Sequence, residues 1–178
     1  MYSRKNIIRK EIKLIKSWMS DEDKIRKSNC IWRQIESLEY FQKAEVVLMY
    51  WSMRGEVYTH DFILHWHKEK TIILPVVDGD SLHLRKFKGE HALCRHATMN
   101  LYEPQGDDYL SPQNIKLVII PGIAFDRHNH RLGRGKGYYD KLLPQLNAYK
   151  IGVGFDFQLL EDIPDDPHDV PMDEVVVG

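Results

Sequence analysis

The sequence predicts one α/β domain with three layers, in which an open, mostly parallel sheet is flanked by helices and preceded by an N-terminal pair of helices. Two observations carry this prediction. Short runs rich in β-branched residues alternate with segments of helical periodicity, which is typical of a parallel sheet covered on both faces. The chain has 178 residues without an internal repeat or a linker, so a single domain over residues 1–178 is expected.

Two helices are expected first. Apolar residues recur at helical spacing over residues 2–19, which predicts an amphipathic helix. Ser20 is followed by three acidic residues, a pattern typical of an N-cap with an acidic first turn. A second helix should therefore run from Ser20 to about Leu38.

Strands and helices then alternate through the middle of the chain. Hydrophobic runs predict buried strands, Thr59 opens a helical segment, and an apolar–polar alternation predicts one half-exposed strand. The expected elements are strands at 45–50 and 71–77, a helix at 59–68 and the half-exposed strand at 81–87. Residues 88–114 carry scattered Gly, Pro, Asp and Asn and are expected to form loops.

The C-terminal third continues this alternation. Residues 116–120 are a β-branched run stopped by Pro-Gly and predict a buried strand. A helix is expected from Tyr138, and Pro144 should kink or shorten it. Strands are expected at 149–155 and 173–177. In such sheets, ligands bind at the carboxyl ends of the strands. That rule brings together the Tyr50–Glu56 loop, the Leu74–Val77 end, the glycine-rich loop near residue 135 and the segment after Phe155.

Composition excludes several classes of function. The 25 basic and 26 acidic side chains nearly cancel, which argues against a general nucleic-acid binder. The two cysteines, Cys30 and Cys94, form no disulfide framework and favour a reducing compartment. The N-terminal segment is charged throughout and has no apolar run that suits a signal peptide or a membrane span. We therefore expect a cytoplasmic protein that binds neither nucleic acid nor membrane.

The most informative motif is Arg131-Leu-Gly-Arg-Gly-Lys-Gly-Tyr-Tyr-Asp140, which follows Pro121-Gly-Ile-Ala-Phe-Asp126. Glycines at alternate positions allow tight turns and close approach of backbone N–H groups, and three cations stand among them. A strand, a cationic glycine-rich loop and a helix start together favour a phosphate group. The motif lacks the Ser or Thr of a Walker loop and the third glycine of a dinucleotide fingerprint.

These residues resemble the signature of the 5-formyltetrahydrofolate cyclo-ligase family. The resemblance extends over nearly the whole chain through further motifs in the same order: Lys5-x-x-x-Arg9, Tyr50-Trp-Ser-Met-Arg-Gly-Glu56 with Thr59, Leu74-Pro-Val-Val77, Glu103-Pro104, His168-Asp169 and Met172-Asp-Glu-Val175. One departure is Asn129, which stands where the family usually has glycine. Asn tolerates a positive φ, so this change is mild.

The resemblance implies an enzyme that uses ATP to convert 5-formyltetrahydrofolate into 5,10-methenyltetrahydrofolate, with Mg²⁺ as cofactor. Arg134 and Lys136 are the implied catalytic residues. The implied ATP-binding residues are Lys5, Arg9, Arg131, Leu132, Gly133, Arg134, Gly135, Lys136, Gly137, Tyr138 and Tyr139. The implied folate-binding residues are Trp51, Glu56, Arg134, Gly135, Lys136, Gly137 and Tyr138. The implied metal ligands are Asp140 and Asp169. A monomer or weak homodimer is expected.

Several alternatives stay open. Trp51 suits the core as well as it suits a ligand, and Tyr138 and Tyr139 could contact folate or only anchor their helix. The runner-up function is a regulatory module that binds ATP or phosphate without catalysis. Zinc sites at the His65/His67 or His128/His130 pairs are disfavoured, because no matching Cys or carboxylate set accompanies them.

Overall fold

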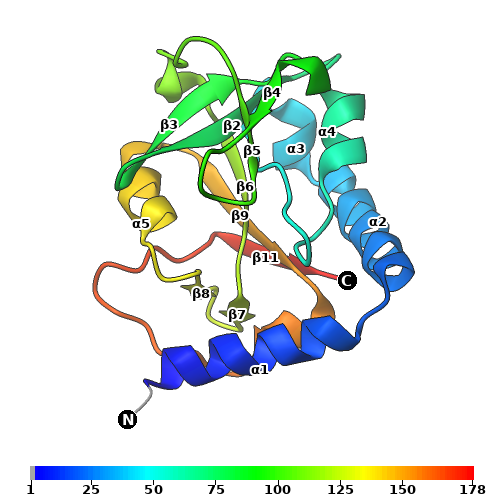
Figure 1. The fold of residues 1–178 in the computed structure, drawn as a ribbon, viewed down its shortest axis with the longest axis vertical. Helices are drawn as coiled ribbons and strands as arrows, with labels where there is room; N and C mark the ends of the chain where they lie inside the picture. Colours follow the sequence, from blue (N-terminus) through cyan, green and yellow to red (C-terminus); the bar gives the residue numbers. More distant parts are fainter. Residues whose placement is uncertain (1–2) are drawn as a thin grey trace.

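The computed structural model describes residues 3–178, and a six-stranded sheet forms its centre (Figure 1). The strand order is β11-β9-β6-β1-β2-β3, and every neighbouring pair is parallel except β2 with β3. The antiparallel strand lies at the edge. The strands are β1 (Val46–Leu48), β2 (Thr71–Asp78), β3 (Ser81–Lys86), β6 (Leu117–Pro121), β9 (Tyr149–Gly154) and β11 (Glu174–Val177). The predicted open, mostly parallel sheet is confirmed.

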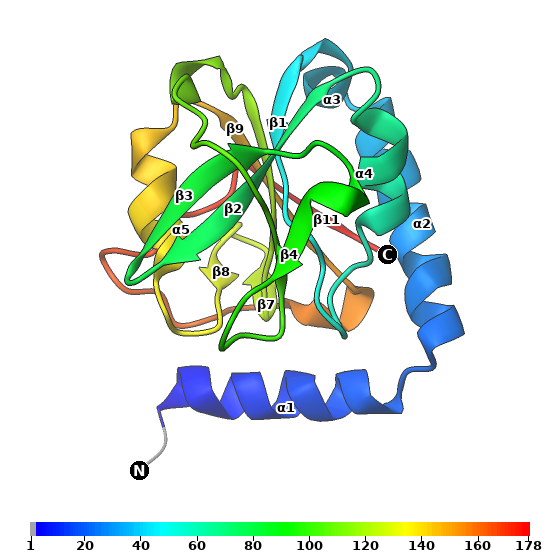
Figure 2. The same ribbon diagram turned by 45° about the horizontal axis from the view of Figure 1, so that its top comes forward.

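Helices and two buried clusters complete three layers. The helices are α1 (Arg4–Trp18), α2 (Asp21–Ser37), α3 (Glu39–Lys43), α4 (His60–Trp66) and α5 (Tyr138–Leu142). One face of the sheet packs on α2, α3 and α4, and the other face packs on α5 and the turn after it. Helix α1 instead runs across one end of the molecule (Figure 2). Within the described residues, no helix is both long and apolar enough to cross a membrane.

The helical pair follows the sequence prediction closely. Ser20 caps α2, and its hydroxyl accepts a hydrogen bond from the Asp23 N–H. At the other end of the chain, Asn129 has a φ of 65°, as its place in the motif requires. Pro144 ends the α-helical geometry of α5 after Leu142, and a 3₁₀ turn over Leu143–Gln145 follows. This agrees with the expected shortening.

Four short elements were not predicted. Helix α3 follows α2 directly, because the chain breaks at Leu38 and restarts around the buried ring of Phe41. Residues 88–114 are not only loop: β4 (Leu93–Arg95) and β5 (Tyr102–Pro104) pair as an antiparallel ribbon. The signature begins as a strand, β8 (Arg131–Leu132), which pairs with β7 (Ala124–Asp126). A two-residue strand, β10 (Leu159–Leu160), joins β7 on its other side.

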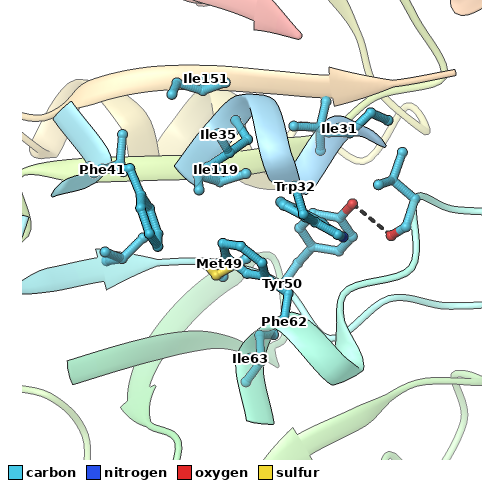
Figure 3. Close-up of a cluster of buried hydrophobic side chains, with 14 of the residues drawn as sticks. Ile31, Trp32, Ile35, Phe41, Met49, Tyr50, Phe62, Ile63, Ile119 and Ile151 are labelled. Atoms are coloured by element: carbon cyan, nitrogen blue, oxygen red, sulfur yellow. Dashed lines mark hydrogen bonds between the residues drawn. The ribbon is translucent and has the colours of Figure 1, made fainter. Parts of the chain in front are cut away.

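The larger buried cluster holds the loop after β1 in place (Figure 3). The Tyr50 hydroxyl donates a hydrogen bond to the Val57 carbonyl oxygen at 3.0 Å, which closes the loop on itself. The indole N–H of Trp32, on α2, donates to the Tyr58 carbonyl oxygen at 2.6 Å. A buried hydrogen bond of this kind is costly to leave unmade, so the loop that carries Glu56 is anchored at both ends.

Candidate active site

A pocket of about 350 Å³ opens at the carboxyl ends of β1, β2 and β6, beneath α1. Tyr50 and Trp51 follow β1, Val77 lies near the end of β2, and Gly122 follows β6, so the predicted convergence of these strand ends is confirmed. One part of that prediction is wrong. The segment directly after Phe155 does not line the pocket, because it folds into a 3₁₀ turn and β10 against β7.

All of the predicted site residues line this one pocket. From α1 and the loop after β1 they are Lys5, Arg9, Trp51 and Glu56, from the signature they are Arg131 through Asp140, and from the C-terminal loop it is Asp169. The structure therefore brings together three chain segments that are far apart in sequence. The C-terminal loop also supplies Asp166, which was not predicted.

The glycine-rich loop between β8 and α5 turns through residues that favour glycine. Gly135 has a φ of 100° and Gly137 a φ of 69°, both in the left-handed region where a side chain would strain the backbone. Arg134 and Lys136 lie exposed between them. Helix α5 has only five residues, so its dipole adds little to the loop. The cations and loop N–H groups must hold a phosphate, which corrects the expectation that a helix start would share that task.

Arg131 lies under the loop rather than on it. Its side chain is 4% exposed, and its terminal N–H groups donate to the Pro121 carbonyl oxygen at 3.2 Å and to Asp140 Oδ1 at 3.5 Å. Its guanidinium carbon lies 5.3 Å from the centre of the Tyr139 ring. Within the described residues, Arg131 Nε is buried and has no hydrogen-bond partner. A buried donor without a partner beside a pocket favours an incoming acceptor.

Arg134 and Glu56 contact each other directly. Arg134 Nη2 donates to Glu56 Oε1 at 2.9 Å, while the Met53 N–H donates to Glu56 Oε2 at 2.8 Å. The Glu56 side chain is 7% exposed and that of Arg134 is 55% exposed. The carboxylate is therefore fixed and almost buried, whereas the guanidinium reaches it from the open loop.

Trp51 contacts both the core and the pocket. Its ring stacks on His60 with centroids 3.9 Å apart and on Phe87 with centroids 5.5 Å apart, and it also lines the pocket. Burial lowers the pKa of His60, although the hydrogen bond to the Ser52 carbonyl oxygen acts in the opposite direction. A neutral imidazole at pH 7 suits this stack. The two interpretations of Trp51 are compatible, because one face packs while the indole still borders the cavity.

Lys5 connects α1 to the C-terminal loop. Its Nζ lies 2.5 Å from Asp169 Oδ2 and 2.7 Å from Asp166 Oδ2. Burial alone would lower the pKa of Lys5, but the hydrogen bonds to Asp166 and Asp169 outweigh it and raise that pKa. Arg9, one turn further along, donates from Nε to the Gly133 carbonyl oxygen at 3.0 Å. Lys5 and Arg9 thus hold the C-terminal and signature loops at opposite sides of the same helix face.

Asp140 and Asp169 are the two candidate metal ligands. Asp140 Oδ1 accepts from Arg131 and from the Val170 N–H at 3.4 Å, so it already touches the loop that carries Asp169. In the described part of the chain, no group of three or more His, Cys, Asp or Glu side chains could hold a metal ion. Mg²⁺ commonly takes one or two carboxylates and completes its shell with phosphate oxygens and water. Two carboxylates on one pocket wall fit that mode of binding.

Sequence reasoning missed Lys16, which lines the pocket from α1. Burial lowers the pKa of Lys16 to about 8, the Arg134 and Lys24 charges lower it further, and Glu56 opposes them. The signal was present in the sequence: Lys16 follows Arg9 by seven residues and Lys5 by eleven. Both separations return to nearly the same direction on a helix. The three cations therefore form one stripe along α1.

The apolar wall of the pocket was also missed. It includes Met99, Leu101 and Tyr102, which belong to the β4–β5 ribbon and its connecting loop. Glu103, one residue further along, accepts a hydrogen bond from the Val77 N–H at 2.6 Å. This buried contact ties the ribbon to β2. The segment was expected to be loop, so nothing in its sequence assigned it to the site.

The family model of the 5-formyltetrahydrofolate cyclo-ligase family matches residues 1–178. A mouse 5-formyltetrahydrofolate cyclo-ligase is 30% identical over 98% of this chain and 93% of its own length. The solved 5,10-methenyltetrahydrofolate synthetase of Aquifex aeolicus is 33% identical, with a TM-score of 0.87 over 98% of this chain and 90% of that one. The corresponding Mycoplasma pneumoniae structure is 26% identical, with a TM-score of 0.79 over 98% of each chain. With its signature, its fold and its pocket in agreement with these relatives, the chain belongs to the 5-formyltetrahydrofolate cyclo-ligase family.

Proposed function

We propose that this pocket binds ATP and 5-formyltetrahydrofolate together and catalyses their conversion into 5,10-methenyltetrahydrofolate, ADP and phosphate. One observation carries the proposal at residue level. Lys5, Arg9, the loop around Lys136, and Glu56 come from separate segments, yet all of them line one cavity. A cationic wall and an acidic, apolar wall face each other there, which suits a triphosphate on one side and a pterin on the other.

The reaction needs activation of a poor electrophile. The formyl oxygen of the substrate attacks the γ-phosphorus of ATP, and the bond from that phosphorus to the bridging oxygen of ADP breaks. The amine nitrogen at folate position 10 then attacks the formyl carbon and forms the new C–N bond. The former formyl oxygen leaves on phosphate, and the amine proton is released. The protein has mainly to align the two substrates and to stabilise negative charge during phosphoryl transfer.

The cations of the signature loop take the charge on the phosphates. Lys136 is exposed on the glycine-flexed loop and suits the γ-phosphoryl oxygens as a point charge. Arg134 supplies a planar pair of donors and reaches both walls, because it already contacts Glu56 across the cavity. Lys5 and Arg9 hold the remaining phosphate oxygens from α1. The buried Nε of Arg131 supplies a further donor from below.

Glu56 and Trp51 bind the folate. The Glu56 carboxylate is held by the Met53 N–H and accepts hydrogen bonds from the amino and ring N–H groups of the pterin. The exposed edge of Trp51, together with Met99 and Leu101, provides apolar surface beside the ring. Tyr138 closes this side and donates to the Gly79 carbonyl oxygen at 3.2 Å.

Asp140 and Asp169 are the residues that would hold Mg²⁺. When bound, the ion neutralises phosphate charge and orients the triphosphate. Asp169 is paired with Lys5 in this structure, so metal and nucleotide binding rearranges that contact. We further propose that residues 1–178 act as one domain and that the protein works in the cytoplasm as a monomer or weak homodimer. Near-zero net charge and two free cysteines support the cellular assignment.

The test is a single incubation. Purified protein is mixed with ATP, magnesium chloride and 5-formyltetrahydrofolate, and the absorbance of the methenyl product is followed. Product should form only when all three are present, with one ADP released for each methenyl group. Folded protein that binds ATP yet forms no methenyl product would favour the regulatory alternative instead.

A further inference from the structure

A second cavity adjoins the active site along the C-terminal half of α1. Its volume is about 800 Å³, and it shares Arg9, Lys16, Ile123 and Arg134 with the active-site pocket. The remaining lining residues belong to the second half of α1, the start of α2 and the Arg54–Gly55 turn. The two cavities therefore communicate at the point where Lys16 and Arg134 stand.

The lining of this cavity, here called the basic groove, is strongly cationic. Six of its side chains are basic and one, Asp21, is acidic; the basic ones are Arg9, Lys13, Lys16, Lys24, Arg54 and Arg134. Asp21 already pairs with Lys24 at 3.2 Å. Within the described residues, Lys13, Lys16 and Arg54 make no ion pair and no side-chain hydrogen bond. Unpaired cations gathered in a cavity favour an anionic ligand.

The groove begins beside the folate wall. Arg54, Gly55 and Glu56 are consecutive, and Gly55 turns the chain with a φ of 86°. Figure 2 shows the loop after β1 descending to the C-terminal half of α1. The N-terminal half of α1 instead contacts the nucleotide side, where Lys5 pairs with the C-terminal loop. A ligand whose ring lies at Glu56 therefore leaves the pocket along the basic groove.

We propose that the basic groove binds the glutamyl carboxylates of the folate substrate, including those of further glutamates joined through the side-chain carboxyl group. This inference rests on the proposed function, because that function places a pterin at Glu56. The folate molecule supplies the matching chemistry, since its end opposite the pterin carries carboxylates. Lys16 receives the first of them at the junction, and Lys13 and Arg54 receive those that follow.

The charge state of Lys16 agrees with this assignment. In the ligand-free protein its burial and the nearby cations Arg134 and Lys24 lower its pKa to about 8. A carboxylate arriving beside Lys16 stabilises the protonated form, so the pKa rises on binding. Protonated lysine is needed for the contact. The affinity for the glutamyl end should therefore fall as the pH rises above about 8, whereas it is retained at pH 7.

The test compares ligands that differ only in the number of glutamates. Dissociation constants of 5-formyltetrahydrofolate with one and with five glutamates are measured without ATP, by fluorescence and calorimetry. Wild-type protein should bind the pentaglutamate about tenfold more tightly, because several charge-assisted contacts add. Lys13→Met and Arg54→Met should each remove part of this gain and leave the monoglutamate unchanged. Lys16→Met should weaken both ligands and abolish the pH dependence above about pH 8.

The control is Lys10→Met, since Lys10 lies on the same helix but lines neither cavity. It makes the same change in net charge, so an equal loss there would show general attraction rather than a site. Equal affinity of the wild type for both ligands would overturn the proposal while methenyl formation proceeds. Weaker ATP binding in Lys13→Met and Arg54→Met, with an unchanged pentaglutamate gain, would assign the groove to the nucleotide and would also overturn it. Absence of methenyl product would instead count against the proposed function.

Discussion

The two walls of the pocket differ in how firmly the fold holds them. Glu56 is 7% exposed and bonded to a backbone N–H, and its loop is closed by the Tyr50 and Trp32 hydrogen bonds. The signature loop opposite carries exposed Arg134 and Lys136 between two glycines of positive φ. The folate wall is preorganised, whereas the nucleotide wall can follow the phosphate group as it is transferred.

The single contact across the cavity shows what this difference means. In the ligand-free structure Arg134 pairs with Glu56 at 2.9 Å. Since pterin N–H groups would occupy the carboxylate and phosphates would attract the guanidinium, both ligands compete with this ion pair. The rigid wall keeps its position when the pair opens, and the flexible loop is the part that moves.

The largest effect is expected from the flexible wall. Lys136→Ala should lower kcat by about 100-fold or more, because it removes a cation that stabilises charge in the transition state. ATP affinity and the melting temperature should change little, since the side chain is exposed and outside the core. Steady-state kinetics, ATP titration and a melting curve measure the three quantities.

Lys141→Ala is the matched control for Lys136→Ala. Lys141 follows the same loop on α5, but its Nζ donates to the Asp80 carbonyl oxygen at 3.0 Å rather than lining the pocket. Its turnover should stay near that of the wild type. If both variants are equally active, the signature loop does not hold the transferred phosphate.

The next effect concerns the two carboxylates. Asp140→Asn and Asp169→Asn should each raise the magnesium concentration needed for half-maximal turnover by about tenfold or more, because an amide is a weaker ligand for a hard cation. Asp166→Asn is the control, since Asp166 also pairs with Lys5 at 2.7 Å but is not a candidate ligand. A shift of the same size in Asp166→Asn would mean that the Lys5 contacts, not metal ligation, cause the change.

A smaller effect is expected from the rigid wall. Glu56→Gln keeps the size of the side chain but removes a charge that strengthens hydrogen bonds to the pterin, which are worth about 1.5–3 kcal/mol each. Folate binding should weaken about tenfold. ATP binding should stay equal or tighten slightly, because Arg134 loses its ion pair. Equal loss of both ligands, measured by separate titrations, would show that Glu56 supports the fold of the pocket.

The sequence predicted the parts of the site that depend on local chemistry. The glycine spacing of the signature indicated its turns, and the Lys5–Arg9 spacing indicated one helix face. It did not predict β8, because two residues become a strand only when β7 lies beside them. It also did not predict that Arg131 would be buried or that the β4–β5 ribbon would line the pocket. Such features depend on contacts between distant segments, which no local pattern specifies.

The smallest effect on catalysis is expected at Asp126, which supports the flexible wall from behind. Its carboxylate is fully buried and accepts hydrogen bonds from the N–H groups of His128, His130 and Ile163 and from the His130 ring at 2.9 Å. Asp126→Asn should lower the free energy of unfolding by about 2–3 kcal/mol, because charged hydrogen bonds are replaced by neutral ones. At a temperature where the variant is folded, kcat should stay within about twofold of the wild type, since Asp126 does not line the pocket.

The pH dependence of that difference identifies its cause. Burial would raise the pKa of Asp126, but the His130 ring and the backbone N–H groups prevail and lower it, while the same contact with Asp126 raises the pKa of His130. A lowered carboxyl pKa contributes stability that is present above about pH 4 and is lost as the pH falls through the folded value. A raised histidine pKa contributes stability that is present below about pH 6.5 and is lost as the pH rises through the folded value. The stability difference between wild type and Asp126→Asn, measured by urea unfolding, should therefore be largest between about pH 4 and 6.5 and shrink on both sides. A difference that stays constant from pH 4 to 9 would show that the His130 charge contributes nothing and that the backbone bonds to Asp126 alone hold the turn before β8.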